Sequence, residues 1–490
     1  MIQYNLKRRN SRAVKVGNET IGGDAPILVQ SMTNTSTNDT EGSASQAKAI
    51  SDAGGRLVRL TTQGVREASN LAEIRKAMKA LGCEAPISAD VHFNPNAAFE
   101  AALHADKVRI NPGNFVIGDT EAIRQKFIPF LETCREHGTS VRLGVNHGSL
   151  SERIMSEYGD TPRGMVESVM EYLRIAREVD FHDIVISIKA SNTVVMVETV
   201  RLLAEKMDQE GMDYPLHLGV TEAGDAEDGR IKSAVGIGAL LHEGLGDTIR
   251  VSLSEPPENE IPVALLLREH VERRIGAPEV KCGDLLRNQD SRNLADKSLP
   301  LKDFICENPR RLGEFALTMD RYISDGGKNP IRMIIRYDCP TLDKLRVRAA
   351  ADFGALLLSG YGEEIKVEDD NFSREELDRL GADIMQAARR RFYKTEFIAC
   401  PSCGRTLFDL QSTLKEVKEA VNALGIKGLK IGVMGCIVNG PGEMADADYG
   451  YVGAGPGRVS IYKGKQLIIK NIPTEEALPA LLKTIRDSMS

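Results

Sequence analysis

Eight short apolar runs alternate with longer amphipathic stretches between residues 27 and 255. Each run with the stretch that follows it has the pattern of a strand and a helix, which is typical of repeated βα units. In residues 163–179, for example, Val166, Val169, Met170 and Leu173 recur at helical spacing, so that one face can pack on a sheet. Eight such units favour a closed (β/α)8 barrel, the TIM barrel. The predicted strands are 27–31, 56–62, 85–91, 107–111, 140–145, 183–190, 216–222 and 248–255.

A doubly wound open sheet is the alternative fold for this alternation. Such a sheet carries a glycine fingerprint in the turn after its first strand. Here that turn, residues 32–37, reads Met-Thr-Asn-Thr-Ser-Thr and contains no glycine. The barrel is therefore the better interpretation.

Two further regions follow the barrel, which we assign to residues 1–255. Residues 256–392 contain an echo of the barrel's last unit: residues 238–251 and 354–367 agree at eight of fourteen positions. This predicts an inserted α/β segment that resembles a degenerate partial barrel and acts as a structural spacer. Residues 393–490 predict an α+β domain with a helix at 412–424, a strand at 428–434 and a hairpin about Lys463-Gly464-Lys465.

Cationic and polar side chains stand at the ends of the predicted barrel strands. Active sites of TIM barrels lie at this edge. Five cations from different strands would repel one another unless they share an anion, and forked guanidinium groups suit phosphate oxygens. We therefore predict a site for a phosphorylated small molecule. Its candidate ligand-binding residues are Arg59, Arg109, Asn111, Arg142, Asn146, Ser149, Lys189, Arg250 and Ser252.

Asp90 and Glu222 are carboxylates at the same strand ends, and we take both as candidate catalytic residues. They are either salt-bridge partners of the arginines or, in the case of Glu222, a proton donor. His92, His147 and His217 lie near this edge without a second nitrogen ligand at metal spacing, which favours neutral, hydrogen-bonded rings.

The third region contains three cysteines that can share one metal centre. Cys400 and Cys403 are three positions apart, and Cys436 lies in a glycine-rich segment. Such a set leaves one coordination position open, and Glu443 is near enough in sequence to supply a weaker carboxylate ligand. A CxxC pair alone is equally consistent with a zinc site or a redox pair.

The strings CPSCGRTLFDL (400–410) and GVMGCIVNGPGE (432–443) resemble the cluster-binding signatures of the bacterial and plastid 4-hydroxy-3-methylbut-2-enyl diphosphate synthases. Upstream, VRINPGN (108–114), VRLGVNHGSL (141–150), HLGVTEAG (217–224) and GLGDTIRVSL (244–253) extend the likeness. It covers roughly residues 20–260 and 393–475, and the segment between them fits neither the short nor the long form of that family.

The resemblance implies an iron-sulfur oxidoreductase of the non-mevalonate pathway of isoprene biosynthesis. Its reaction is the reductive ring opening and dehydroxylation of 2-C-methyl-D-erythritol 2,4-cyclodiphosphate to (E)-4-hydroxy-3-methylbut-2-enyl diphosphate. It also implies that Cys400, Cys403, Cys436 and Glu443 bind a [4Fe-4S] cluster, with ferredoxin or flavodoxin as electron donor. In short-form members, homodimer formation places the cluster domain of one subunit on its partner's barrel, whereas an insert allows capping within one chain. The resemblance also makes Glu443 a candidate for two roles, as a ligand of the cluster and as a catalytic residue.

The alternative function is a zinc-dependent hydrolase or lyase that acts on a phosphorylated metabolite from the same barrel, with three cysteines and a water on the metal. The amino-acid composition does not distinguish these two functions, but it argues against other classes of protein. A formal net charge of −7 argues against nucleic-acid binding, and no apolar run is long enough to span a membrane. Eight scattered cysteines suit a reducing, cytoplasmic location better than a disulfide framework.

Overall fold

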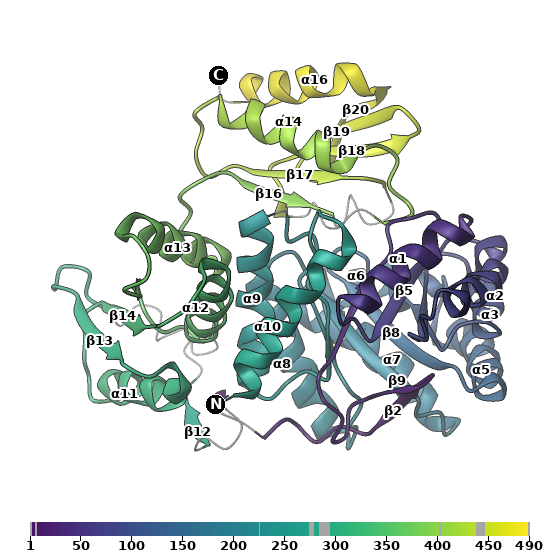
Figure 1. Ribbon diagram of the computed structural model, residues 1–490, viewed down its shortest axis with the longest axis horizontal. Helices are drawn as coiled ribbons and strands as arrows, with labels where there is room; N and C mark the ends of the chain where they lie inside the picture. Colours follow the sequence, from purple (N-terminus) through teal and green to yellow (C-terminus); the bar gives the residue numbers. More distant parts are fainter. Residues whose placement is uncertain are drawn as a thin grey trace.

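A barrel of eight parallel strands forms the centre of the computed structural model, which describes residues 2–4, 7–224, 226–273, 279–283, 295–400, 403–437 and 446–488 (Figure 1). Hydrogen bonds join the strands in the order β10-β11-β4-β5-β6-β7-β8-β9, and a parallel bridge between Ile186 and Leu216 closes the ring. The predicted TIM barrel is thus confirmed. Its strands are β4 (Leu28–Met32), β5 (Leu57–Thr62), β6 (Ile87–Val91), β7 (Lys107–Ile110), β8 (Ser140–Asn146), β9 (Ile184–Lys189), β10 (His217–Leu218) and β11 (Thr248–Ile249).

Helices surround this barrel. They are α1 (Thr40–Asp52), α2 (Val65–Ala80), α3 (Pro95–Ala102), α4 (Pro112–Phe115), α5 (Thr120–His137), α6 (Glu152–Tyr158), α7 (Pro162–Glu178), α8 (Thr193–Gln209), α9 (Ala226–His242) and α10 (Glu260–Glu272). The last of them, α10, begins beyond residue 255, where the sequence placed the end of the barrel, yet it follows the eighth barrel strand and packs on β4.

The local sequence explains how α7 forms and which face it buries. The Thr161 side chain caps it by accepting a hydrogen bond from Gly164 N–H, and Pro162 suits the first turn. Its apolar positions, Val166, Val169 and Leu173 among them, are all buried. None of the described helices is both long and apolar enough to cross a membrane.

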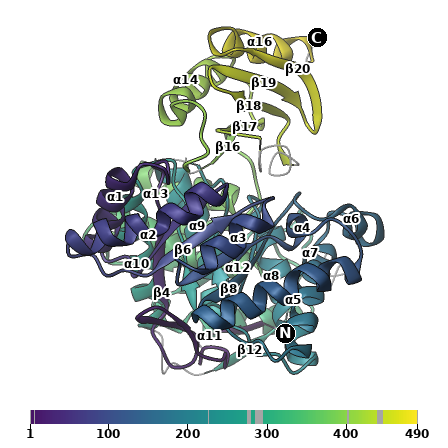
Figure 2. The same cartoon turned by 90° about the vertical axis from the view of Figure 1, so that its right-hand side faces the viewer.

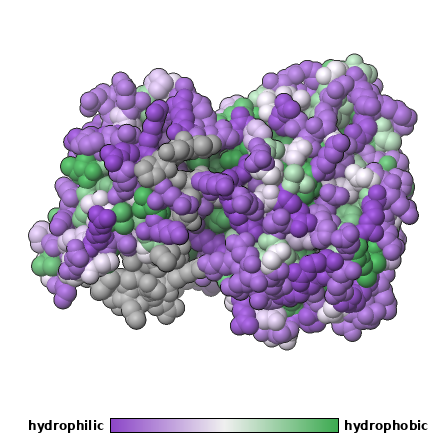
Figure 3. All heavy atoms as spheres, turned by 90° about the horizontal axis from the view of Figure 1, so that it is seen from below, coloured by the Kyte–Doolittle hydropathy of each residue, from purple (hydrophilic) through white to green (hydrophobic). Residues whose placement is uncertain are grey.

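A small hairpin plugs the lower end of the barrel. Strands β2 (Val14–Val16) and β3 (Glu19–Ile21) pair antiparallel, and Val14, Val16 and Ile21 pack against the first residues of the barrel strands. The face of the molecule seen from below is mostly hydrophilic (Figure 3). The hairpin thus covers the amino-terminal ends of these barrel strands.

The inserted segment lies beside the barrel (Figure 1). Its parallel sheet consists of β13 (Lys302–Cys306), β14 (Ile331–Arg336) and β15 (Glu364–Glu368), with helices α11 (Leu312–Ser324), α12 (Leu342–Leu357) and α13 (Arg374–Ala387). The N-terminal strand β1 (Ile2–Tyr4) pairs with β12 (Val280–Cys282) of this segment. The insert is an α/β unit, as predicted.

The two echoing stretches pack against each other. Gly238 lies in α9 and Gly354 in α12, and both are in the equivalent position of the repeat. A methyl group on Gly238 would come within 2.6 Å of the Ala351 side chain, and one on Gly354 within 2.8 Å of the Val235 backbone. Since Ala351 is the equivalent of Val235 in the repeat, each helix presents the same pair of positions to the other. The absence of a Cβ at both glycines permits this close approach.

Buried polar contacts reinforce this helix pair. Oδ1 of Asp352 in α12 lies 3.2 Å from Nε2 of His242 in α9 and 2.7 Å from Nε2 of His270 in α10. The Tyr337 hydroxyl donates to Oδ2 of the same carboxylate at 3.1 Å. Insert and barrel are therefore joined by a polar network as well as by packing.

The C-terminal domain sits above the open end of the barrel (Figure 2). Its five-stranded sheet runs β16-β17-β18-β19-β20, with parallel pairs first and antiparallel pairs after β18. The predicted helix, strand and hairpin are all present. The elements are β16 (Glu396–Ala399), α14 (Leu410–Asn422), β17 (Lys430–Met434), β18 (Tyr449–Gly455), β19 (Arg458–Lys463), β20 (Gln466–Pro473) and α16 (Thr474–Asp487).

We predict that Gly354→Ala lowers the thermal unfolding temperature. Alanine favours the helix by about 1 kcal/mol, but its Cβ would meet the Val235 backbone, and overpacking of a core costs about 1–3 kcal/mol. Gly381→Ala in α13 is the matched control, because its Cβ would meet only the Ile365 side chain at 3.8 Å. The control should unfold at the parent's temperature or above. Equal behaviour of the two variants in calorimetry would contradict the close approach.

A candidate active site between the barrel and the C-terminal domain

One cavity lies where the barrel mouth meets the C-terminal domain. The carboxyl ends of the barrel strands and the loops after them form its floor, and two loops of the C-terminal domain form its roof. No described residue of the insert lines it. The lining residues are Met32, Arg59, Asp90, His92, Arg109, Arg142, Asn146, Lys189, Thr221, Glu222, Arg250, Ser252, Cys400, Cys403, Arg405, Thr406, Met434 and Cys436.

The structure thus brings together most of the residues that the sequence singled out. Two predicted ligand-binding residues do not line the cavity: Asn111 caps α4 by accepting from Gly113 N–H at 3.0 Å and donates to Ser149 Oγ at 3.0 Å. Glu443, the predicted fourth metal ligand, lies outside the described residues.

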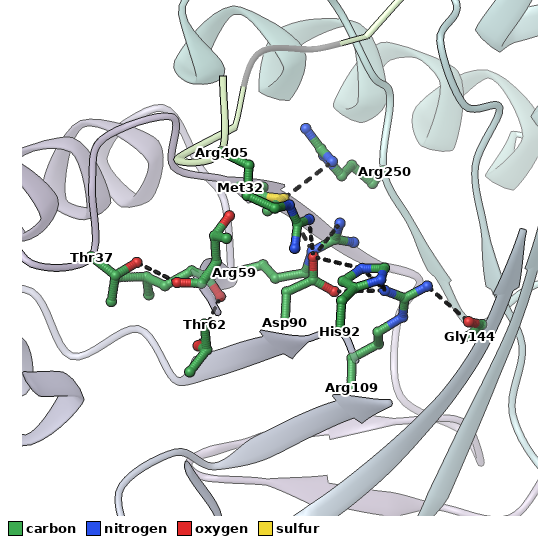
Figure 4. Close-up of polar contacts among 12 residues, drawn as sticks. Met32, Thr37, Arg59, Thr62, Asp90, His92, Arg109, Gly144, Arg250 and Arg405 are labelled. Atoms are coloured by element: carbon green, nitrogen blue, oxygen red, sulfur yellow. Dashed lines mark hydrogen bonds and ion pairs between the residues drawn. The ribbon is translucent and has the colours of Figure 1, made fainter. Parts of the chain in front are cut away.

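Asp90 is the hub of the polar contacts in the cavity (Figure 4). Its side chain is fully buried and accepts hydrogen bonds from Arg59 (3.4 Å), Arg109 (3.2 Å) and Arg405 (3.0 Å). Burial opposes ionisation of Asp90, but Arg59 and Arg109 outweigh it and hold its pKa well below the usual range. The carboxylate therefore keeps its charge and orients the arginines around it.

His92 completes this group as a neutral ring. It contacts both Arg109 and Asp90, and burial together with the Arg109 charge lowers the pKa of His92 to about 3. This low pKa agrees with the neutral ring that the sequence predicts at this position. His217 lies deeper in the barrel, and both of its ring nitrogens are without a partner among the described residues.

Arg250 is held from behind by a carboxylate that the sequence did not single out. Glu260, at the start of α10, accepts from Arg250 Nε (3.0 Å) and Nη2 (2.9 Å), and both side chains are buried. The Ser31 hydroxyl donates to the same carboxylate at 2.6 Å. Such a fork-to-carboxylate pair fixes the plane of the guanidinium group.

Positive charge exceeds negative charge in this cavity. Among the described lining residues, the six cations are Arg59, Arg109, Arg142, Lys189, Arg250 and Arg405, and the two carboxylates are Asp90 and Glu222. Burial, with the neighbouring arginines, lowers the pKa of Lys189 well below its usual range. Several buried guanidinium nitrogens of these arginines have no hydrogen-bond partner in the described structure, namely Arg59 Nη1, Arg109 Nε, Arg142 Nε and Nη1, and Arg405 Nη1. Buried donors of this kind require an acceptor, which points to an anionic ligand.

Glu222 is placed by a strained backbone. Its φ of +46° lies in the left-handed region, which non-glycine residues seldom adopt. The side chain is buried, and Oε2 has no hydrogen-bond partner among the described residues. Burial raises the pKa of the Glu222 carboxyl to about 7, despite the Thr221 hydrogen bond and the charge of Lys189. Such a group can hold a proton and still release it.

The three predicted metal-binding cysteines face this cavity from the roof. Gly435 N–H donates to Cys400 Sγ at 3.3 Å, and Cys403 N–H donates to Thr406 Oγ1 at 3.0 Å. Burial raises the pKa of the Cys400 thiol, so a thiolate there requires a compensating positive charge such as a metal centre. The donor set, three sulfurs with a backbone N–H directed at one of them, fits an iron-sulfur cluster.

Comparison with known proteins shows two matching family models. Residues 11–265 match the GcpE TIM-barrel domain, and residues 396–487 match the GcpE protein C-terminal domain. The chain belongs to the GcpE family.

Curated GcpE relatives resemble the chain over nearly its whole length. A protein of Phocaeicola vulgatus is 44% identical over 605 aligned residues, covering 99% of this chain and 98% of the relative. One of Porphyromonas gingivalis is 45% identical over 573 residues (99% and 98%), and one of Akkermansia muciniphila is 38% identical over 573 (99% and 97%). All three are named 4-hydroxy-3-methylbut-2-en-1-yl diphosphate synthase (flavodoxin).

These alignments are longer than the chain itself. The alignment with the Phocaeicola vulgatus protein spans 605 positions, against 490 residues here, so the relative contains segments without a counterpart in this chain. Residues 266–395, between the two GcpE family domains, match neither of them. The described insert is nonetheless a packed α/β unit.

Sequence reasoning missed several lining residues of this GcpE site. Met32, Thr221, Thr406 and Met434 carry no charge that would single them out. Arg405 had a signal, because it follows Cys403 by two positions, but the sequence does not show that it points into the barrel.

Proposed function

We propose that this chain is a 4-hydroxy-3-methylbut-2-en-1-yl diphosphate synthase. It would open the ring of 2-C-methyl-D-erythritol 2,4-cyclodiphosphate reductively and remove one hydroxyl group as water. The observation that carries the proposal is one cavity with a cationic floor and a roof of three cysteines. The names of the relatives support the same activity, and they give no support to the zinc-dependent hydrolase or lyase alternative.

The floor of the cavity suits the diphosphate group. Arg59, Arg109, Arg142, Lys189 and Arg250 would surround the phosphate oxygens, and the unpaired nitrogens of Arg59 and Arg142 would donate to them. Asn146 and Ser252 offer uncharged donors beside these cations. Asn111 and Ser149 bind each other outside the lining and would steady the loops around it.

The roof suits the electron-transfer group. Cys400, Cys403 and Cys436 would hold a [4Fe-4S] cluster, with Glu443 proposed as the fourth ligand. When bound, such a cluster supplies electrons one at a time, two for each turnover. The names of the relatives favour flavodoxin over ferredoxin as the donor.

Glu222 is the candidate that would donate a proton to the departing hydroxyl group. Loss of a hydroxyl group as water requires a proton on the departing oxygen, and a buried carboxyl that retains its proton near neutral pH can donate it. Asp90 is the less suitable donor, because three arginines keep it ionised. We therefore assign proton transfer to Glu222 and the positioning of the arginines to Asp90.

Both halves of the cavity come from one chain. Ser254 Oγ, on the barrel, donates to the Cys400 carbonyl oxygen at 2.9 Å, and Ala223 forms a bridge with Ala399. These contacts support capping of the barrel by the C-terminal domain of the same chain.

We predict that Cys400→Ala, Cys403→Ala or Cys436→Ala abolishes iron retention, because two thiolates and a weaker oxygen ligand hold a cluster poorly. Cys306→Ala is the control, since this buried thiol lies in the insert and does not line the cavity. Iron and sulfide analysis of anaerobically purified protein measures the difference. Full iron content in Cys436→Ala would contradict the assignment.

Arg142→Met should weaken binding of the cyclic diphosphate at least tenfold and leave the iron content unchanged. Charge-assisted hydrogen bonds to phosphate contribute roughly 1.5–3 kcal/mol each. Titration calorimetry without reductant separates binding from turnover. Arg458→Met, at an exposed position at the start of β19 in the C-terminal domain, serves as control. An unchanged dissociation constant for Arg142→Met would refute the phosphate-binding role.

Glu222→Gln should reduce turnover and leave substrate binding intact, in contrast to Arg142→Met. Glutamine keeps the shape and hydrogen bonding of the side chain but cannot donate a proton from a carboxyl group, so binding is retained and kcat falls steeply, by roughly 100-fold or more. Single-turnover kinetics with reduced enzyme measures the loss. Weaker binding with an unaltered kcat would instead make Glu222 a structural partner of the cations.

A further inference from the structure

Arg405 is the single cation that the C-terminal domain contributes among the described lining residues of the cavity. It crosses from the roof to the floor, where its Nη2 donates to Asp90 Oδ2 at 3.0 Å (Figure 4). The exposed fractions of the two side chains are 6% and 0%. This ion pair therefore links two domains across an interval of 315 residues.

The segment that carries Arg405 is seated tightly on the barrel. A Cβ on the preceding residue, Gly404, would lie 2.7 Å from the Thr35 carbonyl oxygen, so the backbone approaches too closely for any side chain there. The Ser254–Cys400 hydrogen bond and the Ala223–Ala399 bridge hold the same segment from its other end. Arg405 reaches Asp90 only while this seating is kept.

Pairing with Asp90 leaves the Arg405 guanidinium incompletely satisfied. Its Nη1 is buried and has no hydrogen-bond partner among the described residues. Asp90 already accepts from Arg59 and Arg109, so one carboxylate faces three guanidinium groups. Arg405 thus adds one more guanidinium group to a floor that is already cationic, and its unpartnered Nη1 would be satisfied by a buried anion beside it.

We propose that Arg405 is a substrate-binding residue that couples seating of the C-terminal domain to occupancy of the cavity. Its Nη2 holds Asp90, and its free Nη1 donates to an anionic phosphate oxygen of the bound ligand from the side of the cysteines. This inference rests on the proposed function, since it takes the cyclic diphosphate as the ligand. Because coupling between two binding events is reciprocal, a roof that seats better with ligand present must also raise ligand affinity.

Titration calorimetry on anaerobic, iron-loaded protein without reductant tests this inference, with 2-C-methyl-D-erythritol 2,4-cyclodiphosphate as the probe. The variants are Arg405→Gln, Asp90→Asn and the double variant, and Arg458→Gln is the control for loss of an arginine from the same domain. We expect Arg405→Gln to raise Kd at least tenfold, and the control to match the parent. In the Asp90→Asn background, Arg405→Gln should still raise Kd several-fold, because the phosphate contact does not pass through Asp90.

Three results would be decisive against parts of this scheme. A parent-like Kd for Arg405→Gln overturns the inference, as does an effect that disappears in the Asp90→Asn background, which would leave Arg405 only an interdomain ion pair. Failure of the parent itself to bind the probe would instead overturn the proposed function.

Arg405→Lys decides the matter if Arg405→Gln does not fold or loses its iron. Lysine keeps the charge but lacks the fork, so it cannot hold Asp90 and a phosphate oxygen in the same geometry. We expect an intermediate rise in Kd, with parent iron content. A Kd equal to the parent's would overturn the inference here as well.

Discussion

The structure depends on one buried carboxylate that is shared by arginines of two domains. Asp90 orders Arg59 and Arg109 on the barrel floor and meets Arg405 from the C-terminal roof. Charged groups are buried at a high cost unless they are paired, so this arrangement fixes where the arginines lie and where the roof seats. It also leaves a net positive cavity, and the function follows from that excess: the site is built around an anion that the protein does not itself supply.

Most of the architecture could be predicted from the sequence, because most helices and strands follow from the pattern of apolar and polar residues within each segment. Helical spacing in residues 163–179 and the turn residues after the strands depend on neighbours a few positions away. The strand ends were less predictable. Residues 216–222 have a strand-like pattern, yet β10 ends at Leu218, because the chain then turns to bring Glu222 to the cavity with a positive φ. Function, in this case, overrides the local preference.

The residue types that line the cavity could be predicted from the sequence, but the pairs that these side chains form could be predicted only in part. Cations at strand ends and closely spaced cysteines can be recognised from their residue type. The roles of Glu260 and Arg405, in contrast, depend on their hydrogen-bond partners in other elements. A single sequence contains no record of such pairings. The same limit explains why Asn111 and Ser149 were grouped with the cations, although in three dimensions they turn toward each other.

The insert determines how far the C-terminal domain can travel. Helix α13 ends at Ala387 and β16 begins at Glu396, so eight residues separate insert and roof, and Glu396 is further pinned by Lys232 of α9 and by Arg389. Fully extended, eight residues span at most about 26–29 Å. Because the insert is itself clamped to α9, this short tether keeps the roof at a high effective concentration over its own barrel. In this structure the C-terminal domain is thus held over the barrel of its own chain.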